Sequence, residues 1–239
     1  MAEFSIIDTY FNRKSPHSVD LGVGDDSALL TPPPQQQLVI CADTLVAGRH
    51  FPLDTSPHAI GWKSVAVNLS DIAAMGAKPQ SILLALSLPQ IDHDWLKGFS
   101  QGLYDCCDQF GVSLIGGDTT QSPHLTISVT ALGWVDIGQA VTRSAAQVGD
   151  LICVSGTVGD AAFALQHLGH PLQHRLDYPT PRCELGQALK GLAHSMIDVS
   201  DGLAQDLGHI LKASHVGATL QLDQLPINTA LQDLTREQQ

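Results

Sequence analysis

Residues 81–118, SILLALSLPQIDHDWLKGFSQGLYDCCDQFGVSLIGGD, contain the pattern that decides the fold class. Residues 81–89 are an apolar run that ends at a proline, as buried strands often do. Between residues 93 and 110 the apolar side chains recur at intervals of three and four, which predicts an amphipathic helix. Residues 112–118 form a second apolar run that opens into two glycines. A strand, a helix and a strand in succession predict an α/β or α+β arrangement.

The same alternation continues on both sides of this stretch. We expect further strands with apolar or alternating patterns at 27–30, 38–46, 125–135, 151–156, 195–200 and 218–224. We expect further helices at 3–12, 57–75, 159–169, 182–193 and 201–214. The composition shifts mildly around residues 136–150, so we expect two domains that span 1–137 and 138–239.

The overall composition narrows the class of protein. A chain of 239 residues with 44% hydrophobic and 15% charged residues can bury a core, and it is not typical of disordered proteins. Its net charge of −12 argues against binding to nucleic acid, which needs a basic surface. The sequence contains no long uninterrupted apolar run, and its N-terminus does not resemble a secretory signal. We therefore expect a cytoplasmic protein without a membrane segment.

The acidic residues are dominated by aspartate: we count 21 Asp and three Glu. Aspartate favours caps, turns and sites for hard cations. Five turns place Asp beside Gly, Ser, Thr or the end of a strand: GVGDD at 22–26, CADT at 41–44, LSD at 69–71, GGD at 116–118 and DVSD at 198–201. Each could be ordinary turn or cap chemistry. If the five turns converge, their carboxylates repel one another unless cations such as Mg²⁺ neutralise them.

The neighbouring residues suit the binding of phosphate. Glycines at 22, 24, 116 and 117 allow an anion to approach the backbone, and helix starts expected near 70–71 and 200–202 offer N–H groups. The isolated Arg143 could clamp a phosphate, or it could form a surface ion pair. Neither a Walker A motif nor a protein-kinase catalytic loop occurs. From the residues alone we infer a Mg²⁺-dependent enzyme that acts on nucleotide or phosphate substrates.

Six stretches occur in an order that resembles the thiamine-monophosphate kinase family, within the aminoimidazole-ribonucleotide-synthetase-like ATP-binding superfamily. They are GVGDDSALL, ADTLVAGRHF, AVNLSDIAAMGAKP, LIGGDTT, TRSAAQVGD and IDVSDGLAQDLGHI, which lie between residues 21 and 213. The resemblance implies a two-domain fold in which N-terminal sheets pair across a homodimer. It also implies that ATP lies in a cleft with several Mg²⁺ ions.

The resemblance assigns roles to residues at the matching positions. The implied metal ligands are Asp26, Asp43, Asp71, Asp118, Asp198 and Asp201. The implied ATP-binding residues are Gly117, Asp118, Arg143, Ser200 and Tyr104. His50 would bind the thiamine phosphate. Asp25, next to Asp26, is expected to brace its loop instead.

The implied reaction transfers the γ-phosphoryl group of ATP in line to the phosphate of thiamine monophosphate. The second pKa of a phosphate monoester is about 6, so the attacking oxygen is largely deprotonated at neutral pH and we expect no catalytic base. Two alternatives stay open. The chain could bind nucleotide and metal without turnover, or it could be a related ATP-dependent synthetase for another phosphorylated small molecule.

Two features depart from the family pattern. Cys41 and Ala42 stand where hydroxyl residues are usual, and a thiol is a poor ligand for Mg²⁺, so any ligand there should be a backbone carbonyl. The family also continues into a Gly-Gly-Glu-Asp-Tyr-Glu-Leu-type motif, which this sequence does not contain before its last residue, Gln239. We therefore expect the C-terminal α/β domain to be incomplete.

Overall fold

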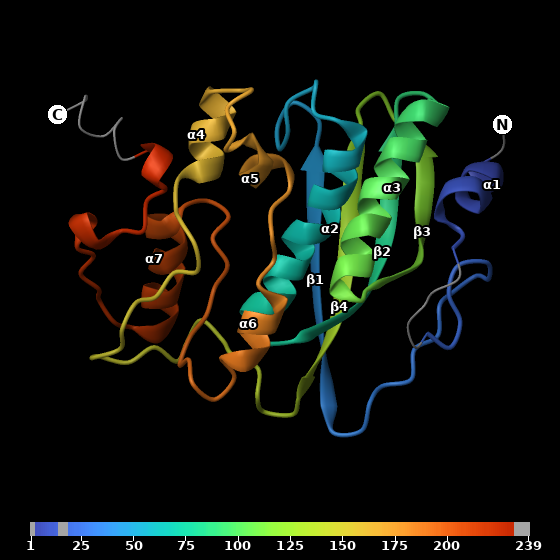
Figure 1. Ribbon diagram of the computed structural model, residues 1–239. Helices are drawn as coiled ribbons and strands as arrows, with labels where there is room; N and C mark the ends of the chain where they lie inside the picture. The colour runs from blue at the N-terminus through green and yellow to red at the C-terminus, as the bar shows by residue number, and fades with distance from the viewer. Residues whose placement is uncertain (1–2, 14–18, 232–239) are drawn as a thin grey trace.

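The computed structural model describes residues 3–13 and 19–231 of the chain. A four-stranded sheet with two long helices on one face forms the N-terminal half (Figure 1). Its strands are β1 (Gln36–Val46), β2 (Lys78–Leu88), β3 (Ser113–Gln121) and β4 (Thr126–Asp136). Its helices are α1 (Glu3–Ile6), which continues into the π-helix η1 (Ile7–Phe11), α2 (Pro57–Ala74) and α3 (His93–Phe110).

The strand order is β1-β4-β2-β3, so β1 and β3 form the two edges. β4 runs antiparallel to both of its neighbours, whereas β2 and β3 are parallel. Parallel strands need a crossover, and α3 provides it. The strand, helix and strand predicted from residues 81–118 are therefore confirmed, and so is the mixed α/β class.

The two faces of the sheet differ in burial. Along β4, Ile127, Val129 and Ala131 are buried in the core formed with α2 and α3, while the alternate residues Ser128 and Thr130 are only half-buried. This alternation is the usual sign that one face packs on a core. The edge strand β1 exposes apolar side chains as well: Leu38 is 43% and Ile40 59% exposed. An exposed apolar edge strand is suited to association with another chain.

Glycines let α2 and α3 pack very closely. A Cβ atom added to Gly61 of α2 would lie 2.1 Å from the carbonyl oxygen of Phe99, and one added to Gly102 of α3 would lie 1.9 Å from that of His58. No larger residue fits at either position without moving a helix backbone. α2 is thereby held at a fixed distance from α3 and the sheet, which matters because α2 carries several of the predicted site residues.

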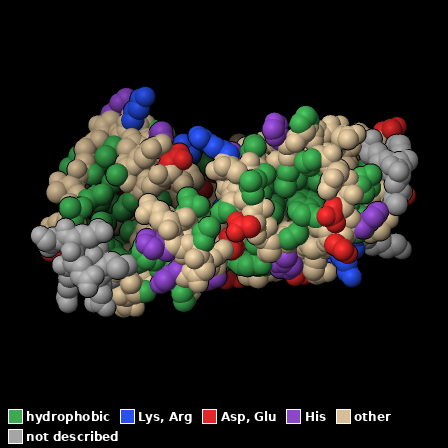
Figure 2. Space-filling model, turned by 90° about the horizontal axis from the view of Figure 1, so that it is seen from above, with side chains coloured by type: hydrophobic (Ala, Val, Ile, Leu, Met, Phe, Trp, Pro, Cys, Tyr) green, Lys and Arg blue, Asp and Glu red, His purple; other side chains and the backbone are tan. Residues whose placement is uncertain are grey.

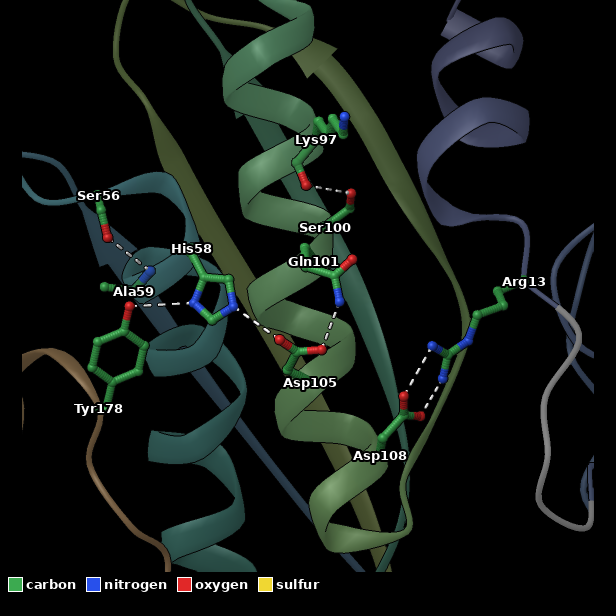
Figure 3. Close-up of polar contacts among 10 residues, drawn as sticks. All are labelled: Arg13, Ser56, His58, Ala59, Lys97, Ser100, Gln101, Asp105, Asp108 and Tyr178. Atoms are coloured by element: carbon green, nitrogen blue, oxygen red, sulfur yellow. Dashed lines mark hydrogen bonds and ion pairs between the residues drawn. The ribbon is translucent and has the colours of Figure 1, made fainter.

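A polar network fastens the C-terminal half to these two helices (Figure 3). His58 of α2 lies between Asp105 of α3 and Tyr178, with its Nε2 2.9 Å from Asp105 Oδ2 and its Nδ1 3.3 Å from the Tyr178 hydroxyl. Trp62 of α2 packs edge-on against Tyr178 and donates its indole N–H to the carbonyl oxygen of Pro179 at 2.9 Å. The chain around residue 178 is therefore anchored to the N-terminal half.

The C-terminal half contains short helices joined by irregular segments. They are α4 (Asp160–Gln166), α5 (Gln173–Asp177), α6 (Cys183–Ala188), α7 (Leu203–Ser214) and the 3₁₀ helix η2 (Leu222–Gln224). Within the described residues, no helix is long and apolar enough to cross a bilayer.

The strands expected at 151–156, 195–200 and 218–224 are not formed. Among the described residues of this half, strand pairing is limited to single bridges, between Thr142 and Ser195 and between Val158 and Ile227. An apolar run becomes a strand only when a neighbouring strand satisfies its backbone groups. The expected strand at 27–30 is likewise reduced to one bridge, between Leu21 and Leu29.

Candidate functional site

Three predicted acidic residues meet where β1 borders α2. β1 supplies Asp43, whose N–H donates to the Asn68 side chain of α2 at 3.0 Å. α2 supplies Asp71, about one helical turn beyond Asn68, and the irregular segment before α7 supplies Asp198. Burial raises the pKa of Asp71 to about 6, with further contributions from the charges of Asp198 and Asp43. Asp43 thus lies close enough to Asp71 and Asp198 for its charge to oppose the ionisation of both.

Arg143 is a cation beside these acids. Burial raises the pKa of Asp198, a hydrogen bond from Ser70 lowers it, and the charges of Asp206 and Asp43 raise it again. The charge of Arg143 lowers the pKa of both Asp71 and Asp198. Seen from above, the molecule is hollowed between its N-terminal and C-terminal halves (Figure 2). We call Asp43, Asp71, Asp198 and Arg143 the β1 group.

The donors of the β1 group fit Mg²⁺, although the carboxylates do not form a closed cage. Among the residues that the structure describes, no three His, Cys, Asp or Glu side chains are placed to hold a metal ion by themselves. Mg²⁺ usually takes one or two protein carboxylates and completes its shell with water and substrate phosphates. A bound cation would favour the ionised form of Asp71 and Asp198, whose pKa values are raised in the metal-free protein. The oxygen donors therefore suit this hard ion.

Cys41 lies next to this group but stays protonated. Burial raises the pKa of its thiol to about 12, together with the charges of Asp71 and Asp43. The Cys41 Sγ donates to the carbonyl oxygen of Asn68 at 3.3 Å. A neutral thiol is not a ligand for Mg²⁺, in keeping with the expectation that only backbone oxygens could contribute at this position.

Asp71→Asn should stabilise the metal-free protein at neutral pH. In the unfolded chain an Asp ionises near its ordinary pKa of 3.8, whereas in the folded protein Asp71 ionises only near 6. The wild type therefore loses stability as the pH rises from about 4 to 6, and we expect the variant to be more stable by about 1–2 kcal/mol above pH 7. Urea unfolding in EDTA at pH 4 and pH 7.5 measures this difference. The gain should vanish at pH 4, and a gain of equal size at both pH values would contradict it.

The loop before α7 is held by an aspartate that the sequence did not single out. Asp206 is 3% exposed, and its Oδ2 accepts the N–H groups of Ser200, Asp201 and Gly202 at 2.9, 3.1 and 3.1 Å. The prediction that these N–H groups are open to phosphate is wrong, because a side chain of the same chain already occupies them. The signal in the sequence is an Asp in the first turn of a helix, a position that favours acids.

The helix start near 200–202 is confirmed, since α7 begins at Leu203, but the other expected helix start, near 70–71, is not formed. α2 runs unbroken through this point and is capped instead by Ser56, whose Oγ accepts the Ala59 N–H at 3.2 Å. Ser70 and Asp71 thus lie inside the helix, where backbone N–H groups bond to the preceding turn. At this position α2 contributes side chains only.

A second set of predicted residues lies toward the opposite edge of the sheet. Asp118 of β3 pairs with Ala85 of β2, which pairs with Ser128 of β4, which in turn pairs with Thr44 of β1. Three strand spacings separate Asp118 from β1, a distance of roughly 14 Å. Asp118 is exposed and shares the less buried face with Ser128.

Tyr104 and Asp26 also lie away from the β1 group. The Tyr104 hydroxyl donates to the carbonyl oxygen of Phe11 at 2.8 Å, and the Arg13 guanidinium lies 4.2 Å above its ring. Arg13 in turn pairs with Asp108 of α3 (Figure 3). The segment 19–30, which carries Asp26, runs on the β3 side of the molecule in Figure 1. We call Asp26, Tyr104, Gly117 and Asp118 the β3 group.

Three further predicted residues are exposed at or near the β1 side. His50 follows β1, and its Nδ1 accepts the Val46 N–H at 3.0 Å, so its proton is assigned to Nε2. Ser200 and Asp201 lie in the loop that Asp206 holds, and Gln205 donates to Asp201 Oδ2 at 3.2 Å. The Asp26 N–H donates to Asp25 Oδ1 at 2.8 Å, which is the loop-bracing contact expected of Asp25.

Comparison with known proteins gives the chain its family. Residues 24–135 match the family described as AIR synthase related protein, N-terminal domain, and residues 147–238 match the corresponding C-terminal domain. The thiamine-monophosphate kinase of Escherichia coli (strain K12) is 49% identical over 242 residues, which cover 96% of this chain and 74% of that protein. The chain belongs to the thiamine-monophosphate kinase family.

Solved structures of thiamine-monophosphate kinases agree with this assignment. The crystal structure of the enzyme from Stenotrophomonas maltophilia K279a is similar with a TM-score of 0.88 at 49% identity, covering 98% of this chain and 79% of that one. A structure described as AaThiL complexed with AMPPCP and TMP is similar with a TM-score of 0.80 at 28% identity, covering 98% and 76%. The resemblance drawn from six motifs is thus confirmed. The roles of single residues and the boundary at 137/138 stay predictions.

Proposed function

We propose that this protein is a thiamine-monophosphate kinase, which transfers the γ-phosphoryl group of ATP to the phosphate of thiamine monophosphate and releases ADP and thiamine diphosphate. The observation that carries the proposal is the β1 group, in which Asp43 lies near Asp71 and Asp198, and Arg143 lies beside these acids. A relative that is 49% identical bears this name, and one neighbouring structure is described as complexed with AMPPCP and TMP.

The proposed chemistry needs charge neutralisation and positioning more than proton transfer. The acceptor is a phosphate oxygen that has already lost its proton near pH 7, so no side chain is assigned as a base. Mg²⁺, held by Asp71, Asp43 and Asp198 with phosphate oxygens, would neutralise the charge that develops on the transferred group. Arg143 would bind a phosphate of ATP, and His50 Nε2–H would donate to the acceptor.

We further propose that the active site is completed by a second copy of the chain in a homodimer. The expected metal ligands and ATP-binding residues should all surround one MgATP, yet the β1 group and the β3 group flank opposite edges of a sheet (Figure 1). A two-fold dimer that joins the β1 edge of one copy to the β3 edge of the other would bring the two groups together. The exposed apolar residues Leu38 and Ile40 on β1 support such an interface.

A product assay tests the reaction itself. The protein is incubated with MgATP and thiamine monophosphate, and thiamine diphosphate is measured by chromatography. We expect one thiamine diphosphate for each ADP, and no product when EDTA removes Mg²⁺. Tight binding of MgATP without any product would favour a binding protein without turnover. ADP formation that depends on another phosphorylated acceptor would favour a related synthetase.

A further inference from the structure

Lys63 of α2 lies beside His50, and the reaction proposed above does not use it. Its Nζ donates to the carbonyl oxygen of His50 at 3.1 Å, and its side chain is half-buried. Within the described residues it forms no ion pair with a carboxylate, unlike Lys190, whose Nζ lies 3.6 Å from Asp136 Oδ2. An ammonium group has three N–H donors, so two donors of Lys63 remain for another partner.

The surroundings of Lys63 favour its pairing with an anion. Burial lowers its pKa from the ordinary 10.5, and the charge of Asp177 at the end of α5 opposes that shift only in part. A half-buried cation without a close counter-ion is unfavourable by itself. An anionic ligand would supply the missing charge and restore the pKa.

The position of Lys63 on α2 places it toward the acceptor end of the site. Ser70, which donates to Asp198, follows Lys63 by seven residues, so both lie on one stripe of the helix about 10 Å apart along its axis. At one end of this stripe Ser70 contacts Asp198 of the β1 group. At the other end Lys63 contacts His50, the residue expected to bind the acceptor. A phosphate held between these ends would face the β1 group, where the γ-phosphoryl group of ATP is expected.

We propose that Lys63 binds the phosphate of the acceptor, a phosphate monoester dianion, together with His50. The proposal rests on the function proposed above. Lys63 would hold the attacking phosphate in place and offset part of the repulsion between two anionic substrates. The competing interpretation is that Lys63 only fixes the loop around His50 through its carbonyl oxygen.

Kinetics of Lys63→Met, Lys63→Arg and the matched control Lys190→Met test the proposal. We expect Lys63→Met to raise the KM for thiamine monophosphate about 10- to 100-fold, as for the loss of a charged hydrogen bond. The KM for MgATP should change by less than about twofold, because Lys63 is proposed to contact the acceptor phosphate and not ATP. Lys63→Arg should recover part of the affinity, and Lys190→Met should behave as the wild type. An unchanged KM for thiamine monophosphate in Lys63→Met would overturn the proposal.

Binding measurements separate phosphate binding from bracing of the loop. By calorimetry, Lys63→Met should lose affinity for thiamine monophosphate and for inorganic phosphate, while its affinity for unphosphorylated thiamine stays unchanged. An equal loss for thiamine would show that Lys63 only braces the loop, and it would overturn the proposal. These binding measurements need no turnover, so they test the role of Lys63 independently of the product assay. Absence of product in that assay would refute the kinase function but not the binding of phosphate by Lys63. Circular dichroism checks that each variant is folded.

Discussion

The variants Asp71→Asn and Asp118→Asn should each be inactive as homodimers. A mixed dimer that contains one copy of each variant should be active. Each substitution removes an expected metal-ligand carboxylate, so each homodimer should lose activity by about 10²- to 10³-fold. Asp71 belongs to the β1 group and Asp118 to the β3 group, at opposite edges of one sheet. If each active site takes one group from each copy, the mixed dimer contains one site with both native residues and one site with neither.

The number of intact sites in a mixed dimer sets the activity that should be recovered. Two differently tagged variants are co-expressed, and dimers that carry both tags are purified and assayed for thiamine diphosphate. Such mixed dimers should show about half of the wild-type activity, and an unselected equal mixture about a quarter. Two substitutions within the β1 group, Asp71→Asn and Asp43→Asn on separate copies, serve as the control, because no site in that mixed dimer is intact. Mixed Asp71/Asp118 dimers without activity would show that both groups act within one copy.

The sequence predicted the N-terminal half more fully than the C-terminal half. Residues 81–118 follow local patterns, and the strand 112–118 finds its partner β2 within the same half. The apolar run at 151–156 has an equally clear pattern, yet Leu151 is 90% exposed and no ladder forms there. Local hydrophobicity sets the preference of a segment, but a strand also depends on a partner that the pattern does not reveal.

The candidate site was predictable in its residue types and less so in its arrangement. Asp turns and Arg143 were found because acids beside glycine or serine are visible in the sequence. Their division between β1 and β3 was not, because it follows from the strand order β1-β4-β2-β3. The role of Asp206 could not be predicted for another reason. Its carboxylate accepts three hydrogen bonds from backbone N–H groups four to six residues earlier, in a loop whose path only the structure gives.

Asp206→Ala should cost about 2–4 kcal/mol of stability, because it leaves three N–H groups without the carboxylate that accepts them. Those groups belong to Ser200, Asp201 and Gly202, and two of these three residues are expected around MgATP. Release of the loop should weaken MgATP binding by about 10²-fold, since small displacements at a site have large effects. Urea unfolding and calorimetry measure the two effects. Asp223→Ala, an exposed acid in η2, should change neither.

Asp206→Asn separates the geometry of the loop from the charge of Asp206. The amide oxygen can still accept N–H groups, so the loss of stability should be smaller than in the alanine variant. The negative charge is lost, however, and that charge raises the pKa of Asp198. We therefore expect the pKa of Asp198, followed by NMR in the metal-free protein, to fall in Asp206→Asn. An unchanged pKa would mean that Asp206 acts on the β1 group only by fixing the path of the loop.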